Sequence, residues 1–271
     1  MDDQSAFERD IERAWDLFDD DLDGVAEALD SARAVEPEDP AVLELDAELA
    51  LAHEDPAAAL TAYERWAQLW PDDPEAHLGA ADIYLYSFND PGAAVKIINN
   101  LIGGVPLHAD EEADARHLLA AAHERRNDHK NMVREWLAVL RLDAASAEPE
   151  PVLKPDEFNA IAERALTELP DELLARLGNV PIIVDDRPSE GMVLDGIDPR
   201  TLGLFSGYAL PNQSVMASVP QTSVIHLFQR NLEAESENED DLEEQIRVTV
   251  LHETAHYFGW DDEELGHFGL N

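Results

Sequence analysis

Apolar positions in the first half of the chain recur with helical spacing, and short proline-bearing turns interrupt them at regular intervals. Pro37 and Pro71 lie 34 residues apart. The segment Asp55–Leu60 (DPAAAL) returns 35 residues later as Asp90–Val95 (DPGAAV). Because proline marks the ends of helices, a period of this length predicts repeated pairs of helices. We expect four such pairs over roughly residues 5–143.

Small residues recur at equivalent positions of these expected pairs. In the first helix of a pair they are Ala47 and Ala81, and in the second helix Ala59 and Ala94. Small side chains let two helices approach closely, while larger residues fill the layer between pairs. The larger residues share one position of the second helix and are Leu29, Tyr63, Ile98 and Trp136.

This pattern resembles the tetratricopeptide repeat, whose closing proline matches Pro37, Pro71 and Pro106. The resemblance implies an array of helix pairs with a concave surface, on which a partner protein or peptide binds. The alternative interpretation is an ordinary helical bundle with a coincidental proline spacing.

A change of composition separates this region from the rest of the chain. Residues 144–151 (AASAEPEP) are small, acidic and proline-bearing, which is typical of a linker. We therefore divide the chain into a tetratricopeptide-like helical-repeat domain (1–143), a linker (144–154) and a second domain (155–271).

The second domain mixes the two periodicities, so the predicted fold class is a helical array followed by a small α+β domain. The acidic run at residues 233–244 is interpreted as a solvated loop that brings negative charge to the start of the last helix. Predicted helices cover 155–169, 171–177 and a final segment from Ile246 to Phe258, and predicted strands cover 180–184, 202–208 and 223–229.

Charge and composition exclude several classes of function. The chain has 60 acidic and 18 basic residues, a formal net charge of −42 and no cysteine. Such a charge repels phosphate backbones and anionic lipid, so we expect no nucleic-acid or membrane partner. Without cysteine there are no disulfides and no thiolate chemistry. The sequence also lacks a secretory signal and an apolar run of about 20 residues, so we expect a cytoplasmic protein.

The last predicted helix contains His252-Glu253-Thr254-Ala255-His256, which has the HExxH pattern. Residues four apart share one face of a helix, so both imidazoles can bind one zinc ion at about 2.0–2.1 Å. Glu253 lies next to the first ligand and can take a proton from a zinc-activated water. The alternative is a pair of surface histidines on an amphipathic helix.

A catalytic zinc ion needs a third protein ligand and one open position. Gly259 can end the helix in a left-handed conformation and turn the chain back toward the metal. Asp262 lies ten residues after His252 and is the preferred third ligand. The alternatives are Asp261, Glu263, Glu264 and His267.

Residues 155–271 resemble the minimal zincin-like metallopeptidases, which carry HExxHxxGxxD close to their C-terminus. The matching pieces include the IIVDD, LGLFSG and IHLF segments and the terminal HETAHYFGWDD. The resemblance implies a zincin-like α+β domain with one Zn²⁺, ligands His252, His256 and Asp262, and Glu253 as the base.

Two further expectations concern the substrate. In zincins, a strand beside the active helix binds the peptide as an added strand, and 223–229 is the candidate here. The developing oxyanion needs a hydrogen-bond donor, for which Tyr208, Tyr257, His226 and Arg230 are chemically suitable.

The sequence therefore predicts a zinc-dependent peptidase whose helical-repeat domain recruits a protein partner or substrate. The alternative is a protein-interaction scaffold whose zincin-like domain binds metal but has little or no proteolytic activity.

Overall fold

The chain divides into two compact units, residues 1–146 and 147–271. The computed structural model describes residues 2–146, 151–169, 171–177, 180–207 and 223–259. Among the described residues, no helix combines the length and the apolar character needed to cross a bilayer.

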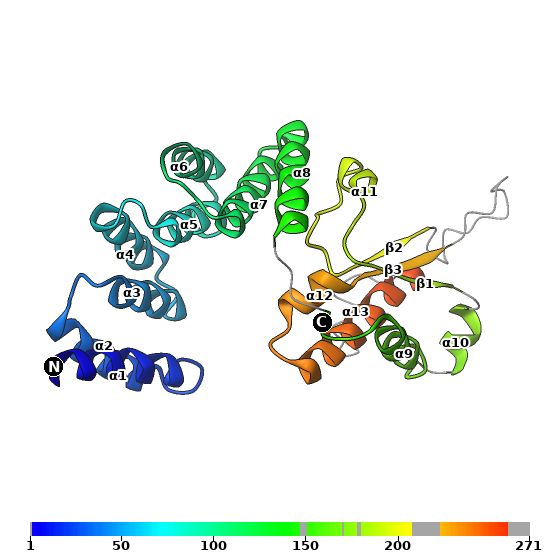
Figure 1. Ribbon diagram of the computed structural model, residues 1–271, viewed down its shortest axis with the longest axis horizontal. Helices are drawn as coiled ribbons and strands as arrows, with labels where there is room; N and C mark the ends of the chain where they lie inside the picture. The colour runs from blue at the N-terminus through cyan, green and yellow to red at the C-terminus, as the bar shows by residue number, and fades with distance from the viewer. Residues whose placement is uncertain (1, 147–150, 170, 178–179, 208–222, 260–271) are drawn as a thin grey trace. The chain divides into compact units, whose positions relative to one another are not determined.

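The first unit consists of helices, each packed against the next along the chain (Figure 1). This arrangement confirms the predicted helical region. The helices are α1 (Asp2–Leu17), α2 (Leu22–Val35), α3 (Pro40–Ala52), α4 (Pro56–Leu69), α5 (Pro74–Asp82), α6 (Pro91–Gly104), α7 (Ala109–Arg125) and α8 (His129–Ala145), with a π-helical segment η1 (Ile83–Ser87) directly after α5.

Buried small residues allow close packing within this unit. The four alanines of the expected repeat positions, at 47, 59, 81 and 94, are completely buried. The larger residues of the equivalent position are buried as well, namely Leu29, Tyr63, Ile98 and Trp136. The side chains that the sequence pattern assigns to the interior therefore form the clusters that hold neighbouring helices together.

An aspartate precedes most helices of the first unit and caps them. Its carboxylate accepts a hydrogen bond from a backbone N–H of the first helical turn, which has no partner within the helix. Proline follows directly in four cases, where its missing N–H costs nothing. The capping residues are Asp21, Asp39, Asp55, Asp73, Asp90 and Asp128.

The turn inside three of the pairs has one backbone conformation. Glu54, Asn89 and Asn127 have φ values of 58°, 52° and 56°, and each immediately precedes a capping aspartate. A left-handed residue followed by an aspartate cap is therefore the common turn of this unit.

The helix pair that contains the π-helical segment η1 has one residue more than the pair before it. Pro40 and Pro56 begin the two helices of one pair and lie 16 positions apart, whereas Pro74 and Pro91 lie 17 apart. A π-turn closes a wider hydrogen-bonded ring than an α-turn and so accommodates one added residue inside a helix. The turn that follows keeps the same left-handed residue and cap.

We predict that replacing the cap Asp90 by alanine destabilises the first unit by about 1 kcal/mol. Its carboxylate accepts from the backbone N–H of Gly92 at 3.1 Å and of Ala93 at 3.0 Å, and both bonds are lost. Chemical denaturation followed by tryptophan fluorescence measures the effect, because four of the five tryptophans lie in residues 1–146. Asp72→Ala, at an exposed turn position, is the matched control. An equal loss in both variants would contradict the capping role.

Carboxylates on α3, α5 and α7, the first helices of three successive pairs, repel one another. Burial raises the pKa of Glu44 on α3, and the charges of Glu48 and Glu75 raise it further. Burial also raises the pKa of Glu75 on α5, with a contribution from Asp114 on α7. Acids of α5 and α7 thus contribute to the raised pKa values of Glu44 and Glu75.

We predict that Asp82→Asn stabilises the first unit at pH 7. Burial, and then the charge of Glu48, raise the pKa of Asp82, so the folded state binds its proton more tightly than the unfolded state does. The associated stabilisation is complete below about pH 4 and is lost as the pH rises through the folded pKa.

The expected gain at pH 7 is a few tenths of a kcal/mol up to about 1 kcal/mol, because solvent screens this partly exposed group. It should vanish near pH 4. Denaturation curves at both pH values measure it, with Asp16→Asn on an exposed face of α1 as control. A gain that persists at pH 4 would contradict the electrostatic cause.

The second unit places helices around a small sheet, which confirms the predicted α+β class. The described strands form a sheet in the order β1-β3-β2, with β1 parallel and β2 antiparallel to the central β3. Along the chain the elements are α9 (Pro155–Leu166), α10 (Asp171–Leu177), β1 (Ile182–Asp185), α11 (Glu190–Leu194), β2 (Gly203–Ser206), β3 (Val224–Phe228), α12 (Gln229–Glu235) and α13 (Glu239–Phe258).

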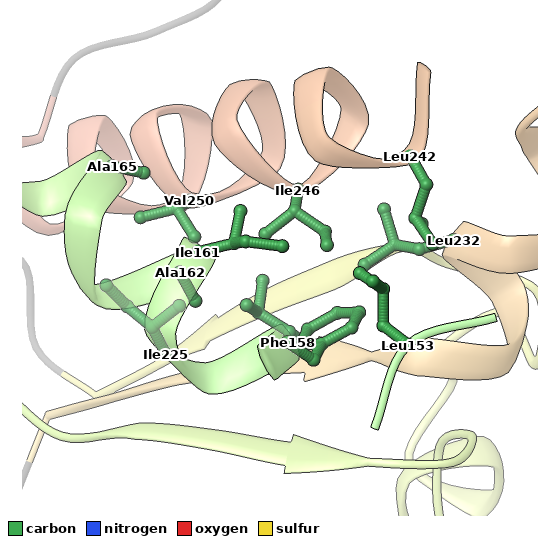
Figure 2. Packing of buried hydrophobic residues seen from close by; sticks show 11 residues of the cluster. Leu153, Phe158, Ile161, Ala162, Ala165, Ile225, Leu232, Leu242, Ile246 and Val250 are labelled. Carbon is green, nitrogen blue, oxygen red and sulfur yellow. The ribbon is translucent and has the colours of Figure 1, made fainter. Parts of the chain in front are cut away.

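The core of this unit lies between α9, α13 and one face of the sheet. Figure 2 shows Ile161 of α9 directed toward Ile246 and Val250 of α13, with Ile225 of β3 close to α9. Leu227 of β3 belongs to the same cluster. Residues 225 and 227 alternate with 224 and 226, so this face of β3 is the apolar one.

The predicted loop at 233–244 is wrong for most of its length. Residues up to Glu235 belong to α12, and α13 begins at Glu239. The side chain of Asn238 caps α13 by accepting from the N–H of Asp241, and the first turn holds three acids. Acids are favourable at a helix N-terminus, so the acidic run starts the helix rather than preceding it.

Candidate metal centre

The long helix α13 presents three different stripes of side chains. Residues 242, 246 and 250 pack into the core. Residues 249, 253 and 257 are buried along a second stripe. His252 and His256 form a third, half-buried stripe. The C-terminal half of α13 is buried on most sides, so the alternative of a surface amphipathic helix does not describe it.

The two histidines converge on one point. Their Nε2 atoms lie 3.0 Å apart, and their rings meet edge to face with centroids 4.6 Å apart. Two ligands of a tetrahedral zinc ion with bonds of about 2.0–2.1 Å lie roughly 3.3 Å from each other. The paired nitrogens therefore fit the spacing that a single zinc ion requires.

The side chain of Glu253 lies between α13 and the sheet. The residue is 8% exposed, and its Oε2 accepts a hydrogen bond of 2.6 Å from the backbone N–H of Phe205 on β2. Burial raises the pKa of the Glu253 carboxyl, while this hydrogen bond and the neighbouring His256 and His252 act in the opposite direction.

The buried carboxylate of Glu135 provides a comparison for the surroundings of Glu253. Glu135 on α8 is 2% exposed and accepts from the guanidinium groups of Arg116 at 2.7 Å and Arg134 at 2.6 Å. Two fixed positive charges thus compensate Glu135, as expected for a structural ion pair. Glu253 instead accepts a hydrogen bond from a backbone amide, and the nearby His256 and His252 lower its pKa electrostatically.

Strand β2 approaches α13 very closely at Gly203. A Cβ atom built on Gly203 would lie 2.6 Å from Cγ2 of Thr249 and 3.0 Å from Cγ of Glu253. Two residues further, the ring of Phe205 packs edge-on against Tyr257 with centroids 5.8 Å apart. The absent side chain of Gly203 therefore allows the strand to lie directly against the helix.

The end of α13 agrees with the sequence prediction. Gly259 has φ 79° and its N–H donates back to the carbonyl groups of Ala255 and His256. The predicted third ligand Asp262 and its alternatives Asp261, Glu263, Glu264 and His267 lie outside the described residues, as does Tyr208. Within the described ranges, no three histidine or carboxylate side chains gather in a way that could hold a metal ion.

The other suggested oxyanion donors have different surroundings. His226 is on the face of β3 away from α13, where it stacks on Phe228. Arg230 pairs with Glu233 at 3.1 Å. Tyr257 is buried and packs against the rings of Phe205 and Phe258.

The prediction that 223–229 offers the substrate edge is wrong. The strand of this segment, β3, is hydrogen-bonded on both sides, to β1 and to β2. The strand that lies over Glu253 is β2, at an edge of the described sheet. The sequence predicted the strand at 202–208, but it did not reveal that Gly203 and the Phe205 amide contact Glu253. The only available signal was a glycine inside a strand, which often marks a close approach.

These features define a class: a small α+β domain in which the central HExxH helix lies against an edge strand. A family model described as Zincin-like metallopeptidase matches residues 177–270, about a third of the chain. Residues 177–270 of the C-terminal unit are therefore similar to zincin-like metallopeptidase domains, a family that typically binds zinc. No curated protein matches the chain.

We predict that Thr254→Val leaves the second unit as stable as before or stabilises it by up to about 1 kcal/mol. The Thr254 hydroxyl is buried and has no hydrogen-bond partner among the residues that the structure describes. Valine keeps the volume and removes the unsatisfied oxygen. Hydrogen exchange of the α13 amides measures the change. A loss of more than about 1 kcal/mol would show that the hydroxyl has a partner after all.

Proposed function

We propose that the protein is a zinc-dependent peptidase in which His252, His256 and Asp262 hold the metal and Glu253 is the general base. The observation that carries this proposal is the pairing of two convergent imidazole nitrogens with a buried carboxylate on the adjacent stripe of the same helix. Imidazole and carboxylate donors with an open position suit a catalytic zinc ion.

Zinc supplies Lewis acidity, which lowers the pKa of water toward about 7 and polarises a peptide carbonyl. The protein contributes the proton transfers. Glu253 accepts the proton of the attacking water and passes it to the leaving amine nitrogen as the C–N bond breaks. The Phe205 amide holds Oε2, so Oε1 is the oxygen available for this proton.

The helical unit is proposed to be a tetratricopeptide-like repeat array that binds a protein partner or substrate. Its support is the regular sequence of capped helix pairs together with large exposed aromatic side chains. Trp70 is 49% exposed, Tyr86 51% and Phe88 43%. Aromatic side chains that remain accessible on a folded unit are typical of protein-binding surfaces.

The test combines metal analysis and cleavage on the full chain. We expect one zinc per chain in the wild type, loss of zinc in His256→Ala, and at least about tenfold weaker zinc binding in Asp262→Ala. Cleavage of a library of unstructured peptides should fall by about 10²- to 10⁴-fold in Glu253→Gln, with zinc retained.

Glu243→Gln is the matched control, because Glu243 lies on the same helix but pairs with Arg164 at its exposed side. It should keep both zinc and cleavage. Stoichiometric zinc without any cleavage would favour the metal-binding interaction protein instead. A wild-type protein that takes up no zinc would refute both functions.

A further inference from the structure

Three contacts fix β2 to one stripe of α13. Gly203 lies against Thr249 and Glu253, the Phe205 amide donates to Glu253, and the Phe205 ring rests on Tyr257. The contacted helix residues are spaced by four, so they follow a single face of the helix. His252 and His256 occupy the neighbouring face, which leaves both imidazoles clear of these contacts.

We infer that Gly203 and the backbone amide of Phe205 are a positioning device for Glu253, which sets the direction of its carboxylate beside the two histidines. This inference deepens the proposed peptidase function and rests on it. The device acts through Glu253 and touches neither metal nor substrate.

The two parts of the device constrain different ends of the carboxylate group. The Phe205 amide holds Oε2 at 2.6 Å. A Cβ at position 203 would lie 3.3 Å from Oε1 and 3.0 Å from Cγ. Any side chain at position 203 would therefore press on the Glu253 side chain from the side of Oε1. A general base must reach its proton within about 3 Å, so such a displacement reduces proton transfer more than binding.

Neighbouring side chains approach Gly203 more closely than they approach Gly191, another glycine of this unit. Gly191 on α11 would place a Cβ 3.7 Å from Oγ of Ser189, which is an ordinary contact. Gly191→Ala is therefore a matched control for the same chemical change in the same unit. Thr249 offers a second control, because Cγ2, the atom closest to position 203, is absent from serine.

The first experiment observes the hydrogen bond directly and needs neither zinc nor activity. In full-length protein labelled with ¹⁵N-phenylalanine, eight amide signals are expected, one of them from Phe205. Glu253→Ala should shift the Phe205 amide proton upfield and accelerate its exchange with solvent. Gly203→Ala should shift the same signal in the same direction, and Gly191→Ala should leave it in place.

The second experiment separates positioning from folding. In zinc-loaded protein, Gly203→Ala should lower kcat by about 10- to 100-fold with KM within about twofold and zinc content unchanged. The double variant Gly203→Ala/Thr249→Ser removes the contact with the Thr249 methyl group but leaves Cβ beside Glu253. It should regain thermal stability without regaining kcat.

The outcomes are decisive in both directions. An unchanged Phe205 amide in Glu253→Ala, or a double variant with wild-type kcat, overturns the positioning role. A wild-type protein that cleaves nothing refutes the proposed function instead, and the amide signal then decides by itself whether β2 holds Glu253.

Discussion

The structure of the C-terminal unit depends on one constraint: α13 must satisfy three different surroundings at once. One stripe of this helix fills the apolar core, a second touches strand β2, and a third presents paired imidazoles. Because the stripes are separated by about 100° of helix rotation, a displacement of α13 changes all three together. The packing of Ile246 and Val250 therefore also fixes the direction in which His252 and His256 point.

Acidic side chains have different surroundings in the two units. In the first unit, acids of α3, α5 and α7 remain near solvent and repel one another, while the buried Glu135 is neutralised by two arginines. In the second unit, Glu253 is buried and accepts a hydrogen bond from a backbone amide, and no arginine pairs with it among the described residues. A buried carboxylate is stable only with compensation, and the identity of the compensating groups distinguishes structural acids from reactive ones.

The sequence predicted those features that depend on local pattern. Helical periodicity located the capped helices, and short apolar segments located the three strands of the described residues, because both signals lie within a few residues. The pairing of His252 with His256 followed from helix geometry alone. The order of the strands did not follow, because three short apolar segments are compatible with several arrangements. The contact of Gly203 with Glu253 joins residues 50 positions apart, and no local pattern encodes it. The acidic run was misassigned because charge density indicates a loop as readily as a helix start.

The π-turn after α5 shows where this chain absorbs a change of length. A single added residue could have enlarged the turn between the two helices, but the turn keeps its left-handed Asn89 and its cap Asp90. The additional residue is instead taken up within the helix, beside the exposed rings of Tyr86 and Phe88. The difference in length between the two pairs is thus taken up at the exposed end of one helix, while the left-handed residue and the aspartate cap of the turn are kept. A residue added at this exposed helix end therefore changes the local surface around Tyr86 and Phe88 and leaves the turn into α6 as it is in the other pairs.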